Sequence, residues 1–254
     1  MTEITTVMLS GLRKEPYSTI LCYPKPSKDE LERRINELSS LGISAVEFQG
    51  PRTVFGVRML GKGCVGLVAS AQGNGGRVAV KILRTDADRS GFEHEASMLR
   101  LANSVNVGPR VLGFSNKFLV MEYLEGKSLP QWVEELAGRG RKSRLKTVLV
   151  KILESCYILD QIGLDHGELS RAPKHVIVNG QDEPEIVDFE TASADRRPSN
   201  VTSITQYLLI GSSLSARIRR ILGPMRKRTL VEALRQYKRN RKFENLQRIL
   251  EVIS

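Results

Sequence analysis

The chain has 254 residues, of which 41% are hydrophobic and 26% are charged. This composition is typical of a globular protein with a sizeable core, and it excludes a disordered or collagen-like chain. The apolar runs are too short for a transmembrane helix, and the N-terminus does not have the pattern of a secretory signal. Three widely spaced cysteines, Cys22, Cys64 and Cys156, favour reduced thiols over a disulfide framework or a zinc site. We therefore expect a cytoplasmic protein without membrane contact.

The net charge of +11 is concentrated in the C-terminal segment. Residues 196–254 contain 14 Lys and Arg and 3 acidic residues, whereas residues 1–195 contain 25 of each sign. A segment of this kind attracts polyanions, so it predicts a contact with RNA or a ribonucleoprotein. A set of solvated helix faces is the alternative interpretation.

Residues 1–52 have the pattern of a small β-α-β extension. Ser27 is a predicted N-cap for a helix that ends near Gly42. Apolar residues at 20–23 and 43–48 predict short strands on either side of this helix.

Short strands then dominate as far as residue 125, and helices dominate after it. The first part predicts strand, glycine-rich turn and strand over 57–70, strands at 78–82, 111–114 and 118–122, and a helix at 91–103. The second part predicts helices within 129–162, a strand pair at 175–178 and 185–187, and helices from Asn200 with stops near Gly211 and Gly223.

A glycine-rich motif stands between the first two of these strands. Gly61, Gly63 and Gly66, followed by Val68, match G-x-G-x-x-G-x-V. Glycines allow a backbone to approach phosphates closely, because no Cβ intervenes. A dinucleotide-binding fold would carry such a motif from a strand into a helix, whereas here it joins two strands. The motif is typical of a loop that covers a nucleotide, with an ordinary hairpin turn as the alternative.

Lys81 lies in an apolar strand 13 residues after Val68. A lysine in this setting needs an anionic partner, because a buried unpaired ammonium is costly. The following helix offers Glu93 and Glu95. The segment that begins at Glu95 resembles the E-A-x-x-L of kinase helices, which favours Glu95, and Glu93 stays open as the alternative.

Three later segments complete an ordered set of motifs. An apolar strand at 118–122 runs into a polar turn, and the segments 166–168 (His-Gly-Glu) and 188–190 (Asp-Phe-Glu) follow. In this order the motifs resemble those of the protein-kinase-like superfamily, in style closest to the small atypical microbial kinases of the RIO type. They correspond to the hinge, the H-R-D and the D-F-G segments of those kinases. The resemblance covers about residues 54–195.

The resemblance implies an α+β, two-lobed protein-kinase-like fold. The N-lobe would span 53–125 and a reduced helical C-lobe 126–254, after the β-α-β extension of 1–52. Mg·ATP would bind between the lobes, with Mn²⁺ as the alternative metal. The residues implied in nucleotide binding are Gly61, Gly63, Gly66, Val68, Ala79, Lys81, Glu95, Met121, Glu122, Leu124 and Ile177.

The catalytic segment departs from the kinase pattern. Glu168 replaces the usual Asp and reaches one bond further, and Pro173 stands where the metal-binding Asn is expected. Kinases leave about 13 residues between this Asn and the Asp of D-F-G. Counting back 13 residues from Asp188 gives His175 as the second metal ligand. Since imidazole is a poor Mg²⁺ ligand, either Asp188 holds a single metal or His175 holds phosphate. The implied catalytic residues are Glu168, Ser170 and Lys81, and the implied metal ligands are Asp188 and His175.

The implied function is transfer of the γ-phosphoryl group of ATP to Ser or Thr of a protein substrate. Hydroxyls at 199, 202 and 203 indicate either autophosphorylation or a helix N-cap at Asn200 or Thr202. Two other functions stay open. The His-Gly pair is also found in small-molecule phosphotransferases, and the changes at Glu168 and His175 are compatible with a catalytically weak ATP-binding module that docks RNA through its basic tail.

Overall fold

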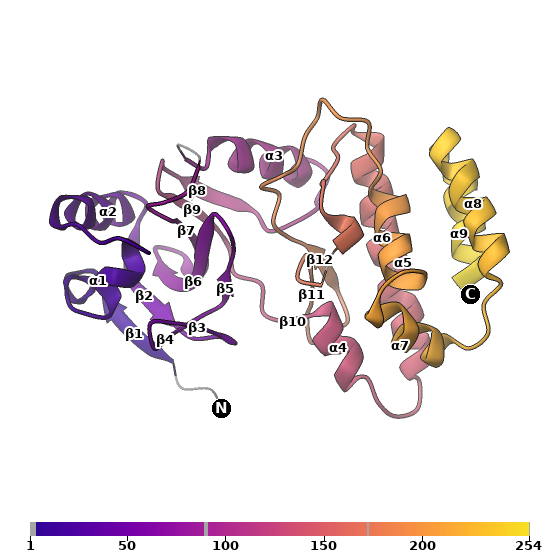
Figure 1. Cartoon of the computed structure of the whole chain (residues 1–254), viewed down its shortest axis with the longest axis horizontal. Coiled ribbons are helices and arrows are strands. Elements are labelled where there is room, and N and C mark those ends of the chain that lie inside the picture. Colours follow the sequence, from indigo (N-terminus) through magenta and orange to yellow (C-terminus); the bar gives the residue numbers. More distant parts are fainter. Residues whose placement is uncertain (1–3, 89–90, 172, 254) are drawn as a thin grey trace. The chain divides into compact units, whose positions relative to one another are not determined.

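The structure, a computed structural model, describes residues 4–88, 91–171 and 173–253 (Figure 1). The chain forms two compact units, which are Met1–Ser97 with Arg110–Tyr123, and Met98–Pro109 with Leu124–Ser254. The architecture is α+β with an antiparallel sheet, which is compatible with a kinase-like fold. The two-lobed arrangement and the boundaries at 52 and 125 stay predictions. None of the helices in the described ranges is long and apolar enough to cross a membrane.

The first unit is built on a sheet with strand order β1-β2-β6-β7-β9-β8, in which β5 also pairs with β6. These strands are β1 (Thr5–Met8), β2 (Ile43–Phe48), β5 (Gly61–Lys62), β6 (Gly66–Gly73), β7 (Gly76–Leu83), β8 (Val111–Phe114) and β9 (Phe118–Glu122). A separate hairpin is formed by β3 (Arg52–Val54) and β4 (Val57–Met59). The strands predicted at 111–114 and 118–122 have the bounds of β8 and β9.

Each face of this sheet has its own core. On one face, η1 (Leu9–Arg13), α1 (Tyr17–Leu21) and α2 (Lys28–Ser40) pack against the alternate β7 residues Val78, Val80 and Ile82. On the other face, Leu83 and Leu119 pack with Phe92 and Ala96 at the start of α3 (Glu93–Asn103). The segment before residue 52 therefore shares the hydrophobic core of the sheet that carries Lys81.

The strand predicted at 20–23 is wrong, because this segment lies in and just after α1. Ile20, Leu21 and Cys22 are all buried in succession, so no alternation distinguishes the two sides of a strand. A short apolar run is compatible with either a buried strand or a buried helical turn. The strand that pairs with β2 is β1 instead. The predicted helix cap is confirmed, since the Ser27 hydroxyl accepts the Glu30 N–H.

The second unit is mostly helical. Its helices are α4 (Leu129–Glu135), α5 (Arg141–Gln161), η2 (Leu169–Arg171), α6 (Asn200–Leu209), α7 (Ser213–Leu222), α8 (Lys227–Arg239) and α9 (Phe243–Ile253). Its strands β10 (Lys127–Ser128), β11 (Val176–Val178) and β12 (Pro184–Ile186) form an antiparallel sheet. The long helix α5 packs against α6, α7, α9 and β12 (Figure 1).

The N-cap predicted for the helix after residue 199 is wrong by at least one residue. Helix α6 begins at Asn200, with Ser199 in the cap position but without a capping bond from its side chain. The Asp160 carboxylate of α5 accepts the N–H groups of Asn200 and Val201 instead. A side chain distant in sequence therefore satisfies helix donors that a local cap usually satisfies.

Candidate active site

The glycine motif forms a tight hairpin between β5 and β6. The Gly63 N–H donates to the Gly66 carbonyl at 2.8 Å. A Cβ on Gly66 would lie 2.8 Å from the Ile82 carbonyl, so the packing of β6 on β7 requires glycine there. A Cβ on Gly61 or Gly63 would meet nothing closer than 3.4 Å. The fold therefore explains one glycine and leaves Gly61 and Gly63 available for a ligand to approach.

Four residues of the predicted nucleotide site lie on one face of the sheet. Val68 on β6 pairs with Lys81 on β7, and Ala79 pairs with Met121 on β9. Directly paired residues of antiparallel strands project to the same side, and so do residues two apart on one strand. This face is the one opposite to α1 and α2.

Lys81 forms a buried ion pair on this face. Its Nζ lies 2.8 Å from Oε1 of Glu95 on α3, and the two side chains are 7% and 3% exposed. Glu95 rather than Glu93 is thus the partner that the structure gives to Lys81. Burying both charges is tolerated because each neutralises the other.

The remaining predicted nucleotide residues are divided between the units. Glu122 ends β9, where its N–H donates to the Arg110 carbonyl at 2.9 Å and its carboxylate pairs with the Arg110 guanidinium. Leu124 and Ile177 belong to the second unit. Ile177 lies on β11 opposite Ser128.

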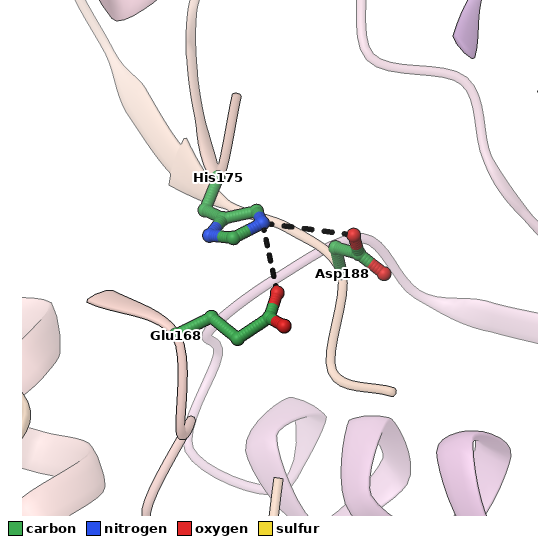
Figure 2. Close-up of side chains that lie close together, drawn as sticks. All are labelled: Glu168, His175 and Asp188. Atoms are coloured by element: carbon green, nitrogen blue, oxygen red, sulfur yellow. Dashed lines mark ion pairs between the residues drawn. The ribbon is translucent and has the colours of Figure 1, made fainter. Parts of the chain in front are cut away.

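Glu168, His175 and Asp188 converge in the second unit (Figure 2). His175 Nε2 lies 3.2 Å from Glu168 Oε2 and 3.7 Å from Asp188 Oδ2. One ligating atom of each residue lies within 4.8 Å of those of the other two. His175 is buried, while the Glu168 and Asp188 side chains are 39% and 30% exposed. Ser170 lies exposed on η2, outside this cluster.

The β11–β12 hairpin brings His175 and Asp188 together. Val176 pairs with Ile186, and the Val187 N–H donates to the His175 carbonyl at 3.0 Å, which extends the pairing by one step. Asp188 follows with a φ of +72°. This left-handed conformation is rare for most residues but several-fold more frequent for Asp and Asn. The chain direction therefore changes at the residue whose carboxylate faces His175.

The loop before Glu168 is fixed to the same hairpin. His166 is fully buried, and its Nε2 lies 3.0 Å from the Val187 carbonyl. Burial lowers the pKa of His166 to about 4, so the ring is neutral and Nε2–H donates to that carbonyl. Gly167 has a φ of +90°, and a Cβ there would lie 2.8 Å from the Thr191 carbonyl. Glycine is thus required at the position directly before Glu168, one of the carboxylates of the cluster.

Asn200 and Asp160 support this loop, and the sequence patterns did not identify them. The Asn200 side chain accepts the His166 N–H at 2.8 Å and donates to the Leu164 carbonyl at 2.7 Å and to Asp160 Oδ1 at 2.9 Å. Asp160 also accepts the Tyr237 hydroxyl at 2.9 Å, and burial raises the pKa of this carboxyl group. The sequence signal for Asp160 was that it is a single Asp on the apolar side of a predicted helix. This signal does not identify the groups that Asp160 binds.

The cluster has the donor set of a divalent cation site. Two carboxylates provide hard oxygen ligands, which suit Mg²⁺ and Mn²⁺. The imidazole Nε2 is a third donor that suits Mn²⁺ better than Mg²⁺. Without a cation, His175 can donate Nε2–H to Glu168 and hold that carboxylate in place. The residues therefore fit a metal, and the same geometry also fits an oriented general base.

Comparison with known proteins finds a distant similarity. No family model matches the chain. The chain is 26% identical over 182 residues to "Probable serine/threonine-protein kinase PknB" of Lactococcus lactis subsp. lactis (strain IL1403). The aligned region covers 68% of this chain and 25% of the relative. The chain thus matches about a quarter of that protein's length. This distant homology supports a kinase-like protein of the protein-kinase-like superfamily.

Proposed function

We propose that the protein is an ATP-dependent protein kinase, of the small atypical RIO type, that phosphorylates Ser or Thr of a protein substrate in the cytoplasm. The observation that carries this proposal is the convergence of Glu168, His175 and Asp188. Glu168 and Asp188 come from two separate kinase-like motifs 20 residues apart. The distant similarity to a protein named as a Ser/Thr kinase supports the same conclusion.

The first unit would bind the nucleotide phosphates. Lys81 is held by Glu95, so its ammonium is fixed for contact with the α- and β-phosphates. The backbone at Gly61 and Gly63 can approach phosphate oxygens because no side chain intervenes. Val68, Ala79 and Met121 would provide apolar contacts to the base from the same sheet face.

The second unit would hold the metal and the acceptor. The Asp188 carboxylate would bind Mg²⁺ or Mn²⁺, which neutralises phosphate charge when bound. Glu168 would orient the acceptor hydroxyl and take its proton, while Nε2–H of His175 keeps the carboxylate in position. Ser170, exposed two residues away, would contact the acceptor. If His175 binds the metal or a phosphate instead, Glu168 has to be oriented by the loop alone.

The test is transfer of label from γ-labelled ATP with Mg²⁺ or Mn²⁺, with and without generic protein acceptors. Wild-type protein is compared with Lys81→Met, Glu168→Gln and Asp188→Asn, and with Glu154→Gln as the control. Glu154 is an exposed carboxylate on α5, so its change removes the same charge outside the cluster. Asn at position 188 keeps the left-handed backbone accessible.

We expect labelled Ser or Thr with wild type and Glu154→Gln, and at least a ~100-fold loss in the other three variants. Label that survives Glu168→Gln would remove Glu168 as the base. Transfer without an added acceptor would identify autophosphorylation. Transfer only to small hydroxyl compounds would favour the phosphotransferase alternative. Nucleotide binding without any transfer would favour the ATP-binding module that docks RNA through 196–254.

A further inference from the structure

Two segments of the second unit carry exposed basic side chains, and neither segment contains an acidic residue. Residues 139–146 lead into and begin α5, and residues 219–228 end α7 and begin α8. Seven of the eight relevant side chains are exposed and Arg219 is half-buried. We call this set the basic surface, and it comprises Arg139, Arg141, Lys142, Arg219, Arg220, Arg226, Lys227 and Arg228.

The fold joins these two segments, although about 80 residues separate them in the sequence. Helix α5 packs against α7 (Figure 1). A Cβ placed on Gly223, the residue that ends α7, would lie 3.9 Å from Lys142 Nζ. Arg226 follows Gly223 by three residues, and Arg220 precedes it by three. The two segments therefore meet where Lys142 lies beside Gly223, so the basic surface includes the start of α5 as well as the C-terminal segment.

The charges of the basic surface are not compensated within the protein. None of its eight side chains has an ion-pair partner within residues 4–88, 91–171 and 173–253. Two neighbouring arginines do have such partners, because Arg144 pairs with Asp182 and Arg217 pairs with Glu134. The basic surface therefore differs from these two neighbours, because its charges have no internal partner in the part of the chain that the structure describes.

These charges also oppose the helices that carry them. The first turns of α5 and α8 contain basic residues and no acidic residue, and neither helix has a side-chain cap bond. Cations at a helix N-terminus are disfavoured by the helix dipole, by about 0.3–1 kcal/mol each at an exposed site. An arrangement that costs helix stability is explained if an external polyanion binds there.

We propose that the basic surface binds the phosphate backbone of RNA. Six of its eight residues are arginine, whose planar guanidinium contacts phosphate oxygens in pairs. A membrane surface fits less well, because the exposed large apolar side chains described in this unit, Ile158 and Phe243, lie outside both segments. The proposal goes beyond kinase activity and needs no nucleotide, and it shifts the predicted RNA contact from 196–254 to a surface that includes the start of α5.

The experiment measures binding of the full chain, without ATP, to a fluorescein-labelled 20-nucleotide uridine RNA by fluorescence anisotropy at 50 to 200 mM KCl. A 20-base-pair DNA duplex of the same label distinguishes the two sources of phosphodiester. Two variants each remove three charges from the basic surface. They are Arg139→Gln/Arg141→Gln/Lys142→Gln and Arg226→Gln/Lys227→Gln/Arg228→Gln.

A matched control removes three exposed positive charges from the same unit but outside the basic surface, as Lys238→Gln/Arg239→Gln/Lys242→Gln. We expect each variant of the basic surface to weaken RNA binding at least ~tenfold at 100 mM KCl. Each should flatten the log–log salt slope by about 2, since each lost phosphate contact is worth about 0.7 on single strands. The control should change Kd less than ~threefold, and Asp188→Asn should bind RNA like wild type.

Several results would overturn the proposal. Equal losses in the control and the two variants would mean that net charge alone is responsible. Absence of RNA binding at 50 mM KCl would refute the proposed RNA site. Binding to anionic lipid vesicles or to polyglutamate, with RNA at least tenfold weaker, would assign the surface to a different partner class. Tighter binding of duplex DNA than of RNA would retain phosphate recognition but refute RNA as the ligand. Thermal unfolding of all variants confirms that each is folded.

Discussion

The Lys81–Glu95 pair and the Glu168–His175–Asp188 cluster have opposite physical characters, although both consist of charged or ionisable groups. The pair joins one ammonium to one carboxylate at 2.8 Å, with both side chains almost fully buried. The cluster sets two carboxylates around one imidazole, with about a third of each carboxylate side chain exposed. The pair joins opposite charges that neutralise each other, whereas the cluster has two carboxylates and is suited to accept a cation.

This difference separates two ways in which a site residue contributes. Changing one member of a buried ion pair should reduce folding stability, because the other charge stays in a poorly solvated place. Changing one acid of a solvent-accessible cluster should cost little stability, because solvent screens that charge. Both changes should abolish the proposed activity, so stability measurements separate the two sites where activity measurements do not.

The largest effect is expected for Lys81→Met, which removes the ammonium and preserves the length of the side chain. Glu95, only 3% exposed, then has to stay charged in the core without that ammonium or take up a proton. We expect the free energy of unfolding to fall by about 3–5 kcal/mol. Urea denaturation followed by circular dichroism measures this change.

The double variant Lys81→Met/Glu95→Leu is the control for this prediction. It replaces the pair with apolar groups, which is often close to neutral for buried ion pairs, so at least half of the lost stability should return. A single variant within ~1 kcal/mol of wild type would show that the pair is less important for folding than its burial indicates.

A similar contrast is expected between two glycines of the same loop. In Gly66→Ala the new Cβ would lie 2.8 Å from the Ile82 carbonyl, so β6 and β7 have to separate. We expect a loss of about 1–3 kcal/mol, as for other overpacked sites. In Gly63→Ala the nearest contact is 3.5 Å, so stability should be unchanged or rise by up to ~1 kcal/mol.

In Gly63→Ala we expect ATP affinity to fall although folding stability does not. A Cβ there occupies space that the fold leaves open, so the Kd for ATP, measured by calorimetry, should rise although the protein is not destabilised. Unchanged ATP affinity in Gly63→Ala would refute the role of this glycine in nucleotide binding.

The sequence predicted the parts of the fold that local patterns determine. The strands at 111–114 and 118–122 were predicted with the bounds of β8 and β9, because a short polar turn separates two apolar runs. The β3–β4 hairpin was missed, since its turn places Phe55 at a φ of +47°, which turn-residue preferences do not indicate. Helix α1 was mistaken for a strand because its buried run is too short to show a period.

The candidate site was predictable where motif order was informative. The resemblance to kinase motifs suggested Glu95, Glu168 and Asp188, and the kinase spacing added His175. The structure places the last three together. It did not suggest Asn200, which lies 34 residues after His166 and contacts only its backbone. Such a contact leaves no sequence pattern, because every residue other than proline at position 166 has the same N–H group. Residues that support a loop through tertiary contacts can therefore be identified only once the fold is known.

A smaller effect is expected for His175→Asn, which changes a nitrogen donor of the cluster into an amide. Asn offers the oxygen that Mg²⁺ prefers, and it loses the imidazole that suits Mn²⁺. We expect the ratio of Mn²⁺ to Mg²⁺ affinity to fall about tenfold, equivalent to ~1.4 kcal/mol. Metal titrations followed by calorimetry measure both affinities. An unchanged ratio would mean that His175 is not a ligand and that its role is to orient Glu168.

The smallest effect on stability is expected for Asp188→Asn, and its sign is informative. Asn tolerates the φ of +72°, so the backbone should stay as it is, whereas Ala would add strain. In chelator, loss of one of two carboxylates in this cluster should leave stability unchanged or raise it by up to ~0.5 kcal/mol, since both are partly exposed.

Metal binding should reveal what this carboxylate contributes. A ligand at ten times its Kd stabilises a folded protein by about 1.4 kcal/mol, so Mn²⁺ should raise the Tm of wild type. It should leave the Tm of Asp188→Asn unchanged, because one of the two carboxylate ligands is gone. If Asp188→Asn lost more than ~1.5 kcal/mol in chelator, the cluster would be a structural ion-pair network like Lys81–Glu95, and the contrast between the two sites would fail. If Mn²⁺ stabilised both proteins equally, the cation would bind elsewhere and Asp188 would have no part in holding it.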